Sequence, residues 1–155
     1  MIYDSQILNS KILIVDDEPT NVKLLEQVLK QLGYAAIKST TDSREVVDHY
    51  KEFQPDLILL DLKMPHLDGV QVIEKLKQAG NENWVPVLVI TAQTNHTNRL
   101  RVLDAGAGDF LGKPFDILEV SVRIKNMLKL SLLNKMSDKN NQLLEKKIRE
   151  GYQNK

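Results

Sequence analysis

Three short apolar runs in this sequence predict the centre of a β-sheet. They are Lys11–Val15, Leu57–Leu60 and Val85–Ile90, and each is four to six residues long. Continuous runs of this length are typical of strands buried on both faces, because neither side of such a strand meets water. Two weaker runs, Ala35–Lys38 and Asp109–Leu111, complete a set of five predicted strands.

Between these runs, apolar residues recur three or four positions apart, which is the spacing of one face of a helix. Gly33, Gly80 and Gly106 stand where three of the helices are expected to end. His49 and His96 lie among polar neighbours and are interpreted as surface residues. The predicted helices are Asn21–Leu32, a helix from a cap at 41–43 to Phe53, Val70–Ala79, Asn95–Ala105 and one long helix from Phe115 onward.

Strands that alternate with helices in this way predict an α/β fold, in which helices cover both faces of a parallel sheet. The carboxyl ends of parallel strands lie along one edge of the sheet, and ligands of open α/β sheets bind at that edge. Side chains placed just after the strands are therefore the candidates for a functional site.

Polar residues stand just after four of the five predicted strands. Asp16 and Asp17 follow the first strand, Asp61 the third, Thr91 the fourth, and Lys113 lies just beyond the fifth. Taken alone, the two adjacent acids fit a helix cap as well as a metal site, since Asp before Pro is a common helix start. Four such groups on one edge favour a shared site.

Carboxylate oxygens without Cys or His ligands suit a hard cation, and Mg²⁺ fits best. Asp16, Asp17 and Asp61 also need a nearby cation to stay ionised, because clustered carboxylates raise each other's pKa. Lys113 adds a positive charge and Thr91 a hydroxyl, so the group as a whole suits a phosphoryl group. An Asp oxygen can attack phosphorus and form an acyl phosphate, while Mg²⁺ and Lys offset the charge on the equatorial oxygens.

Composition excludes several other classes of protein. A length of 155 residues suggests one domain with at most an appendage, and 21 basic residues balance 21 acidic ones. Absence of cysteine excludes disulfides and thiolate chemistry, and no Gly-x-x-x-x-Gly-Lys-Ser/Thr pattern of a P-loop NTPase is present. No apolar run approaches the roughly 18 residues of a membrane span, and Met1–Gln6 lacks the basic start of a signal peptide. A cytoplasmic protein is expected.

In combination, these motifs resemble the receiver domain of bacterial two-component response regulators. The matching residues are Asp16-Asp17, the stretch Asp61–Gly69, Thr91-Ala92 and Lys113-Pro114-Phe115, and the resemblance extends over roughly Lys11–Lys129. It implies a doubly wound, five-stranded parallel sheet of the flavodoxin-like type with strand order 2-1-3-4-5. It also implies a cis peptide bond between Lys113 and Pro114.

The resemblance further implies how a phosphoryl group and Mg²⁺ would be held. Asp61 would accept the phosphoryl group from a sensor histidine kinase or a phosphotransfer protein. Mg²⁺ would be bound directly by Asp17, Asp61 and the backbone carbonyl of Lys63, whereas Asp16 would act through water.

Two residues would form the switch that reads out phosphorylation. Thr91 would hydrogen-bond to the phosphoryl oxygen, Lys113 would pair with it, and Phe110 would turn inward as Thr91 moves. This would remodel the face formed by the fourth helix, the fifth strand and the helix that follows. Gly108 and Gly112 stand where many relatives have larger residues, and they are expected to loosen the fifth strand.

The chain is expected to divide into a receiver domain, 1–129, and a helical extension, 130–155. A short heptad pattern in the extension favours a coiled-coil homodimer, although Lys147 falls on the seam and a solvated, fraying helix is the alternative. The seam consists of Leu133, Met136, Asn140 and Leu143. From Arg123 on, basic residues outnumber acidic ones, but no aromatic residue is interleaved before Tyr152. A nucleic-acid surface is therefore not indicated, and no membrane partner is expected.

The long helix resembles the signalling helices that lead to cyclic-dinucleotide enzymes, such as HD-GYP phosphodiesterases and GGDEF cyclases. A phosphorylation-dependent receiver controlling such an output is therefore expected, with no enzymatic activity beyond its own phosphoryl transfer and autodephosphorylation. A stand-alone regulator that acts by partner binding or dimerisation is the alternative. No helix-turn-helix domain is expected after Lys129, since 26 residues follow it in this sequence. A haloacid-dehalogenase-like phosphatase fits poorly, since such enzymes have a second acid two residues after the nucleophile and Lys63 stands there after Asp61.

Overall fold

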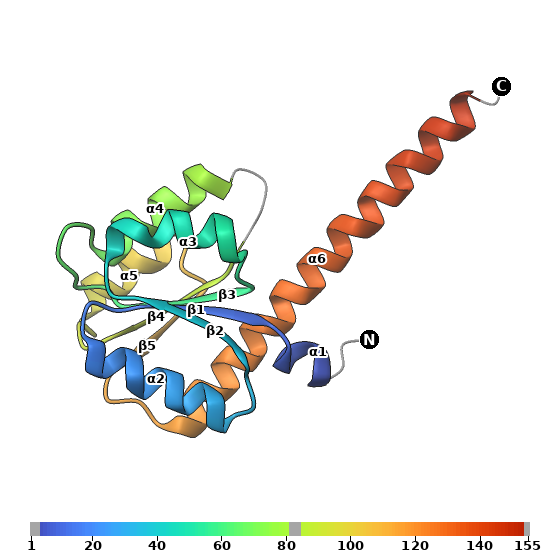
Figure 1. The fold of residues 1–155 in the computed structure, drawn as a ribbon. Coiled ribbons are helices and arrows are strands. Elements are labelled where there is room, and N and C mark those ends of the chain that lie inside the picture. The colour runs from blue at the N-terminus through green and yellow to red at the C-terminus, as the bar shows by residue number, and fades with distance from the viewer. Residues whose placement is uncertain (1–3, 81–84, 154–155) are drawn as a thin grey trace.

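Five parallel strands form a single sheet in the order β2-β1-β3-β4-β5 (Figure 1). The computed structural model describes residues 4–80 and 85–153, without the side chains of 138–142 and 152–153. The flavodoxin-like, doubly wound sheet expected from the sequence is confirmed. The strands are β1 Lys11–Val15, β2 Ala36–Thr40, β3 Leu57–Leu60, β4 Val87–Thr91 and β5 Asp109–Gly112.

Helices cover both faces of the sheet (Figure 1). On one face lie α2 and the first part of α6, and on the other face lie α3, α4 and α5. The helices are α1 Asp4–Leu8, α2 Pro19–Gln31, the 3-10 turn η1 Ser43–Glu45, α3 Val46–Phe53, α4 Gly69–Gly80, α5 His96–Ala105 and α6 Ile117–Gln153.

The alternation of side chains along each strand produces two separate hydrophobic cores. In β1, Ile12 and Ile14 pack with α2 and α6, whereas Leu13 and Val15 pack with the helices of the other face. All four are at most 1% exposed. Burial on both faces explains why the central strands are apolar at every position, as the sequence indicated.

Several boundaries differ from those predicted, for local reasons. The second strand runs to Thr40 because Ser39 and Thr40 pair with Ile14 and Val15 of β1 despite their polar side chains. The last helix begins at Ile117 and not at Phe115. The carboxylate of Asp116 accepts a hydrogen bond from the backbone N–H of Leu118 at 2.9 Å, which caps the first turn.

Two features near the helices were not anticipated. The short helix α1 lies beside α6 (Figure 1), and its Ile7 is 2% exposed in the core. His49, interpreted as a surface residue, has only 20% of its side chain exposed, and its Nε2 lies 3.4 Å from a carboxylate oxygen of Glu45. His96, at the start of α5, is exposed as expected.

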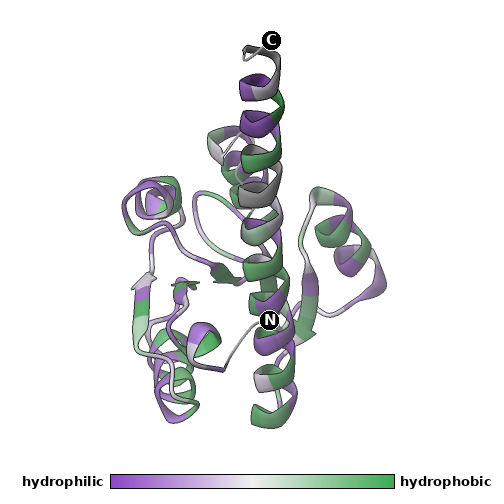
Figure 2. Ribbon diagram, turned by 90° about the vertical axis from the view of Figure 1, so that its right-hand side faces the viewer, coloured by the Kyte–Doolittle hydropathy of each residue, from purple (hydrophilic) through white to green (hydrophobic). Residues whose placement is uncertain are grey.

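The helix α6 is 37 residues long and projects far beyond the sheet (Figures 1 and 2). Its first part packs on the core through Val120, Ile124, Met127 and Leu128. Several apolar residues of α6 are exposed instead, among them Ile117, Leu118, Val122, Leu130, Leu133, Met136, Leu143, Leu144 and Ile148. The predicted seam residue Asn140 lies outside the described side chains. Within the described residues, no helix is long and apolar enough to cross a membrane.

Candidate functional site

Three carboxylates meet at the carboxyl edge of the sheet, where β1 and β3 end. Asp16, Asp17 and Asp61 each offer an oxygen, and these oxygens all lie within 4.8 Å of one another. Asp17 and Asp61 line a cleft of about 630 Å³ together with Thr91 and Lys113. The structure therefore brings together the acids, the hydroxyl and the cation that the sequence placed at separate strand ends.

Asp16 is the most buried of the three acids and has both oxygens engaged. Its side chain is 2% exposed; one oxygen accepts a hydrogen bond from Lys113 Nζ at 2.9 Å and the other from the backbone N–H of Glu18 at 3.0 Å. The N-cap of α2 is Glu18, which makes no capping side-chain bond. The first two acids are therefore not the helix cap that was the alternative interpretation.

Asp61 lies at the end of β3 with 12% of its side chain exposed. One carboxylate oxygen accepts a hydrogen bond from the backbone N–H of Leu62 at 2.7 Å, and the other lies 3.5 Å from Lys113 Nζ. Burial raises the pKa of Asp61, and the charge of Asp16 acts in the same direction, while Lys113 and a hydrogen bond from Thr91 oppose the rise. A cation in the cleft would favour the ionised form.

The loop after Asp61 is held in place by contacts that the sequence did not reveal. Gly69 N–H donates to the Leu62 carbonyl at 2.7 Å, and a Cβ on Gly69 would lie 2.9 Å from the Asp61 carbonyl oxygen. Glycine is thus required by close packing against backbone and not only by the turn. Buried Ser43, expected only as part of a helix cap, donates from Oγ to the Pro65 carbonyl at 2.9 Å.

Thr91 and Phe110 are both buried where β4 and β5 lie side by side. Thr91 is 1% exposed, and its hydroxyl accepts a hydrogen bond from the backbone N–H of Gln93 at 3.1 Å. Phe110 is 7% exposed and already packs into the core beneath α3, α4 and α5. The Lys113-Pro114 bond is cis, as the resemblance implied.

The two glycines of the β5 region make room for neighbouring side chains. A Cβ at Gly108 would approach Met127 Cε to 2.7 Å, and one at Gly112 would approach Thr94 Cγ2 to 2.7 Å. Gly108 N–H also donates to the Val87 carbonyl at 2.9 Å. Looseness of the fifth strand, expected from these glycines, stays a prediction.

Several further residues line the cleft. Met64, Pro65 and Ala92 belong to the motifs that carry the resemblance, whereas Glu18, Asn21 and Gln93 lie close in the sequence to predicted site residues. Asn21 reaches the cleft because it stands in the first turn of α2, directly after the β1–α2 loop.

Residues 12–125 match the family model of the response regulator receiver domain. The chain belongs to this family. Among curated relatives, the alkaline phosphatase synthesis transcriptional regulatory protein PhoP of Bacillus subtilis is 38% identical over 124 residues, which is 80% of this chain and 50% of PhoP. The transcriptional regulatory protein PcoR of Escherichia coli is 39% identical over 77% of this chain and 51% of PcoR. The receiver spans about half the length of these relatives.

Solved receiver structures have the same fold. The receiver domain of sensor histidine kinase PA1611 from Pseudomonas aeruginosa, which has a magnesium ion coordinated in its active-site cleft, is 30% identical with a TM-score of 0.71 and covers 78% of this chain and 98% of its own. A putative response regulator from Chloroflexus aurantiacus is 31% identical with a TM-score of 0.73, over 78% of this chain and 98% of its own.

Proposed function

We propose that this receiver accepts a phosphoryl group on Asp61 from a histidine kinase or a phosphotransfer protein in the cytoplasm, with Mg²⁺ as cofactor. The observation that carries the proposal is the position of Asp61, which lines the cleft, belongs to the carboxylate cluster and lies 3.5 Å from Lys113. Asp16 is a poorer acceptor, because its oxygens are already bound to Lys113 and Glu18.

In the proposed reaction, a carboxylate oxygen of Asp61 attacks the phosphorus atom of a phosphohistidine. The new O–P bond forms an acyl phosphate, the N–P bond breaks, and the leaving imidazole nitrogen takes up a proton. The Lys113 ammonium pairs with the incoming phosphoryl oxygens, and the Thr91 hydroxyl donates a hydrogen bond to one of them. Enzymatic activity is limited to this transfer and to hydrolysis of the acyl phosphate.

The donors in the cleft fit Mg²⁺, since they are oxygens gathered within a few ångströms. Asp17, Asp61 and the backbone carbonyl of Lys63 would hold the ion directly. Asp16 would act through water, in line with its two occupied oxygens. When bound, Mg²⁺ neutralises negative charge on the phosphoryl oxygens.

The signal would leave the site through the face formed by α5, β5 and the start of α6. Thr91 would move toward the phosphoryl group, and Phe110, buried in this structure, would follow it. Arg123 of α6 lies 2.7 Å from Asp109 of β5, so a shift of β5 would be passed to α6. This two-state change needs only a few kcal/mol of differential stability.

The proposal is tested on the wild-type chain by intact mass spectrometry. Incubation with acetyl phosphate and Mg²⁺ is expected to add one phosphoryl group, and EDTA is expected to prevent the addition. The histidine kinase is not needed, because a small phosphodonor supplies the same group. Failure to detect an adduct under any of these conditions would leave a receiver that acts without phosphorylation.

We also propose that the chain divides into a receiver, 1–129, and a helical extension, 130–155, and that α6 carries the output. We propose that exposed Leu133, Met136 and Leu143 pair two copies of the chain, in a stand-alone regulator or ahead of an effector such as a cyclic-di-GMP enzyme domain. Sedimentation is expected to show a concentration-dependent dimer, and Leu133→Glu is expected to weaken it. A monomer at every concentration would contradict this part of the proposal.

A further inference from the structure

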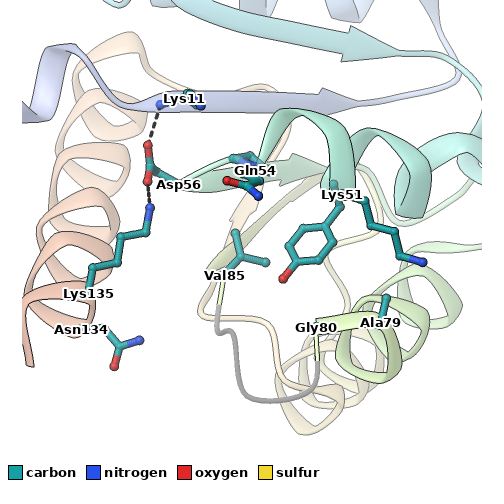
Figure 3. A pocket seen from close by; sticks show the side chains of 11 residues that line it. Lys11, Lys51, Gln54, Asp56, Ala79, Gly80, Val85, Asn134 and Lys135 are labelled. Carbon is teal, nitrogen blue, oxygen red and sulfur yellow. Dashed lines mark hydrogen bonds and ion pairs between the residues drawn. The ribbon is translucent and has the colours of Figure 1, made fainter. Parts of the chain in front are cut away.

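We propose that Asp56, at the amino end of β3, is an anchor that sets the direction in which α6 leaves the receiver. It acts by pairing with Lys135 of α6 (Figure 3). This contact lies at the opposite end of β3 from Asp61, separated from it by the four buried residues Leu57–Leu60. The inference needs no phosphorylation and stands independently of the function proposed above.

The backbone of β1 positions the Asp56 carboxylate. One oxygen accepts a hydrogen bond from the backbone N–H of Lys11 at 2.8 Å, and the backbone N–H of Asp56 donates to the Lys11 carbonyl at 2.8 Å. Only 12% of the side chain is exposed. The other oxygen accepts from Lys135 Nζ (Figure 3), so the lysine reaches a carboxylate whose position is already fixed.

Lys135 stands where α6 parts from the rest of the fold. Ser131 is 1% exposed and Leu132 packs against the core, whereas the described side chains beyond Lys135 are exposed. Among the described side chains of α6, Lys135 is the last one with a hydrogen bond or ion pair to the rest of the receiver. It therefore restrains α6 at the point where a small tilt would displace the far end of the helix most.

Beyond Lys135, α6 continues as a single helix, so a tilt at Lys135 would displace its far end. Neither Gly nor Pro occurs in α6 before Gly151, so nothing in the sequence favours a kink between the anchor and the tail. The 18 residues from 136 to 153 extend about 27 Å, and a tilt of about 10° at the base would move the far end by about 5 Å.

An ordinary surface ion pair contributes little, because both side chains must be ordered and water screens their charges. In this pair the acid is already ordered, because the buried Asp56 carboxylate accepts a hydrogen bond from Lys11 whether or not Lys135 is present. Only the half-exposed Lys135 has to be ordered when the pair forms. The contact is thus suited to direct the helix even where it adds little to the free energy of unfolding.

The test follows the direction of α6 by double electron–electron resonance, which measures the distance between two spin labels. The chain has no cysteine, so labels at Glu74→Cys on α4 and Arg149→Cys on the tail are unambiguous; both residues are exposed. Labelled chains are diluted with unlabelled chains so that only distances within one chain are recorded. Lys135→Met, which keeps the length of the stem and removes the charge, is expected to broaden and shift the distance distribution.

Lys129→Met is the matched control, since Lys129 is an exposed lysine of the same helix, and it is expected to leave the distribution unchanged. Asp56→Asn, which retains an acceptor for the Lys11 N–H, is expected to reproduce the effect of Lys135→Met. The double variant should be no broader than either single variant, because both remove the same contact. Salt at 1 M should move the wild type toward the variants.

If Lys135→Met has the same distance distribution as the wild type, and circular dichroism shows an intact fold, the proposed anchor is wrong. Additive broadening in the double variant would also overturn it, because the two residues would then act separately. Adding acetyl phosphate separates this inference from the proposed function. If α6 keeps one direction in both phosphorylation states while Lys135→Met still broadens it, the anchor stands and the proposed switch fails.

Discussion

Replacing Asp61 with asparagine is expected to abolish the phosphoryl adduct and to make the magnesium-free protein more stable. The adduct is lost because an amide oxygen is a far weaker nucleophile than a carboxylate. Stability rises because Asp61→Asn removes one of three clustered, partly buried negative charges, while Lys113 keeps its 2.9 Å pairing with Asp16. A gain of roughly 0.5–2 kcal/mol is typical of substitutions that relieve unfavourable charge.

The stability gain should depend on pH in a defined direction. Burial raises the pKa of Asp61, so the native state holds this proton more tightly than the unfolded chain does. Wild-type stability is therefore lost as pH rises from the ordinary Asp pKa through the raised native value. The advantage of Asp61→Asn should be full above that window and disappear below it. Urea unfolding in EDTA at pH 7 and near pH 3, below the ordinary Asp pKa, measures both ends.

Two matched variants distinguish the role of Asp61 from a general effect of lost charge. Asp17→Asn keeps the acceptor but loses a proposed Mg²⁺ ligand, so its adduct should form slowly and respond weakly to Mg²⁺. Asp48→Asn, at an exposed position of α3, should leave both the adduct and the stability unchanged. An adduct on Asp61→Asn equal to that of the wild type would place the acceptor at another residue.

Lys113→Met is expected to be the most destabilising of the site substitutions in the absence of Mg²⁺. Lys113 lies 2.9 Å from Asp16 and 3.5 Å from Asp61, and the Asp16 side chain is only 2% exposed. Removing one partner of a buried ion pair leaves an uncompensated charge, which costs about 3 kcal/mol or more. A loss of this size corresponds to a decrease in Tm of about 6–12 °C for a chain of this length.

Mg²⁺ should partly restore the stability of Lys113→Met, because the ion supplies positive charge to the same carboxylates. A ligand that binds only the native state stabilises it more the tighter it binds, and three acids without the lysine should bind the cation more tightly. Thermal unfolding with and without Mg²⁺ tests this, with exposed Lys30→Met as the control. Equal Mg²⁺-induced shifts in wild type and Lys113→Met would show that Lys113 does not compensate the acids.

The main architecture was predictable because the central strands are buried on both faces and the helices on one. Burial on both faces produces apolar runs such as Leu57–Leu60, and burial on one face produces the helical spacing of Val22, Leu25, Val28 and Leu29. The carboxyl ends of β1 and β3 were predictable for the same reason, since a polar residue ends each of these two apolar runs. The sequence therefore assigns Asp16, Asp61, Thr91 and Lys113 to one edge of the sheet.

Other features could not be predicted because they depend on contacts between distant segments. Buried Ser43 supports the loop after β3 through Pro65, and a Cβ on Gly69 would meet the Asp61 backbone. Neither role leaves a periodic pattern, since each depends on one side chain and one approach of the backbone. Helix α1 likewise is only five residues long and has too few positions to show a helical period.

The sequence by itself determined the order of strands and helices, the acids and lysine at the strand ends, and the membership in the receiver family that these motifs indicate. Tertiary structure alone decided that Lys113 pairs more closely with Asp16 than with Asp61, and that Asp56 and Lys135, 79 positions apart, meet at the base of α6. The physical reason is that hydrophobic periodicity records burial along one element, whereas the pairing of charges depends on distances that exist only after the elements have packed.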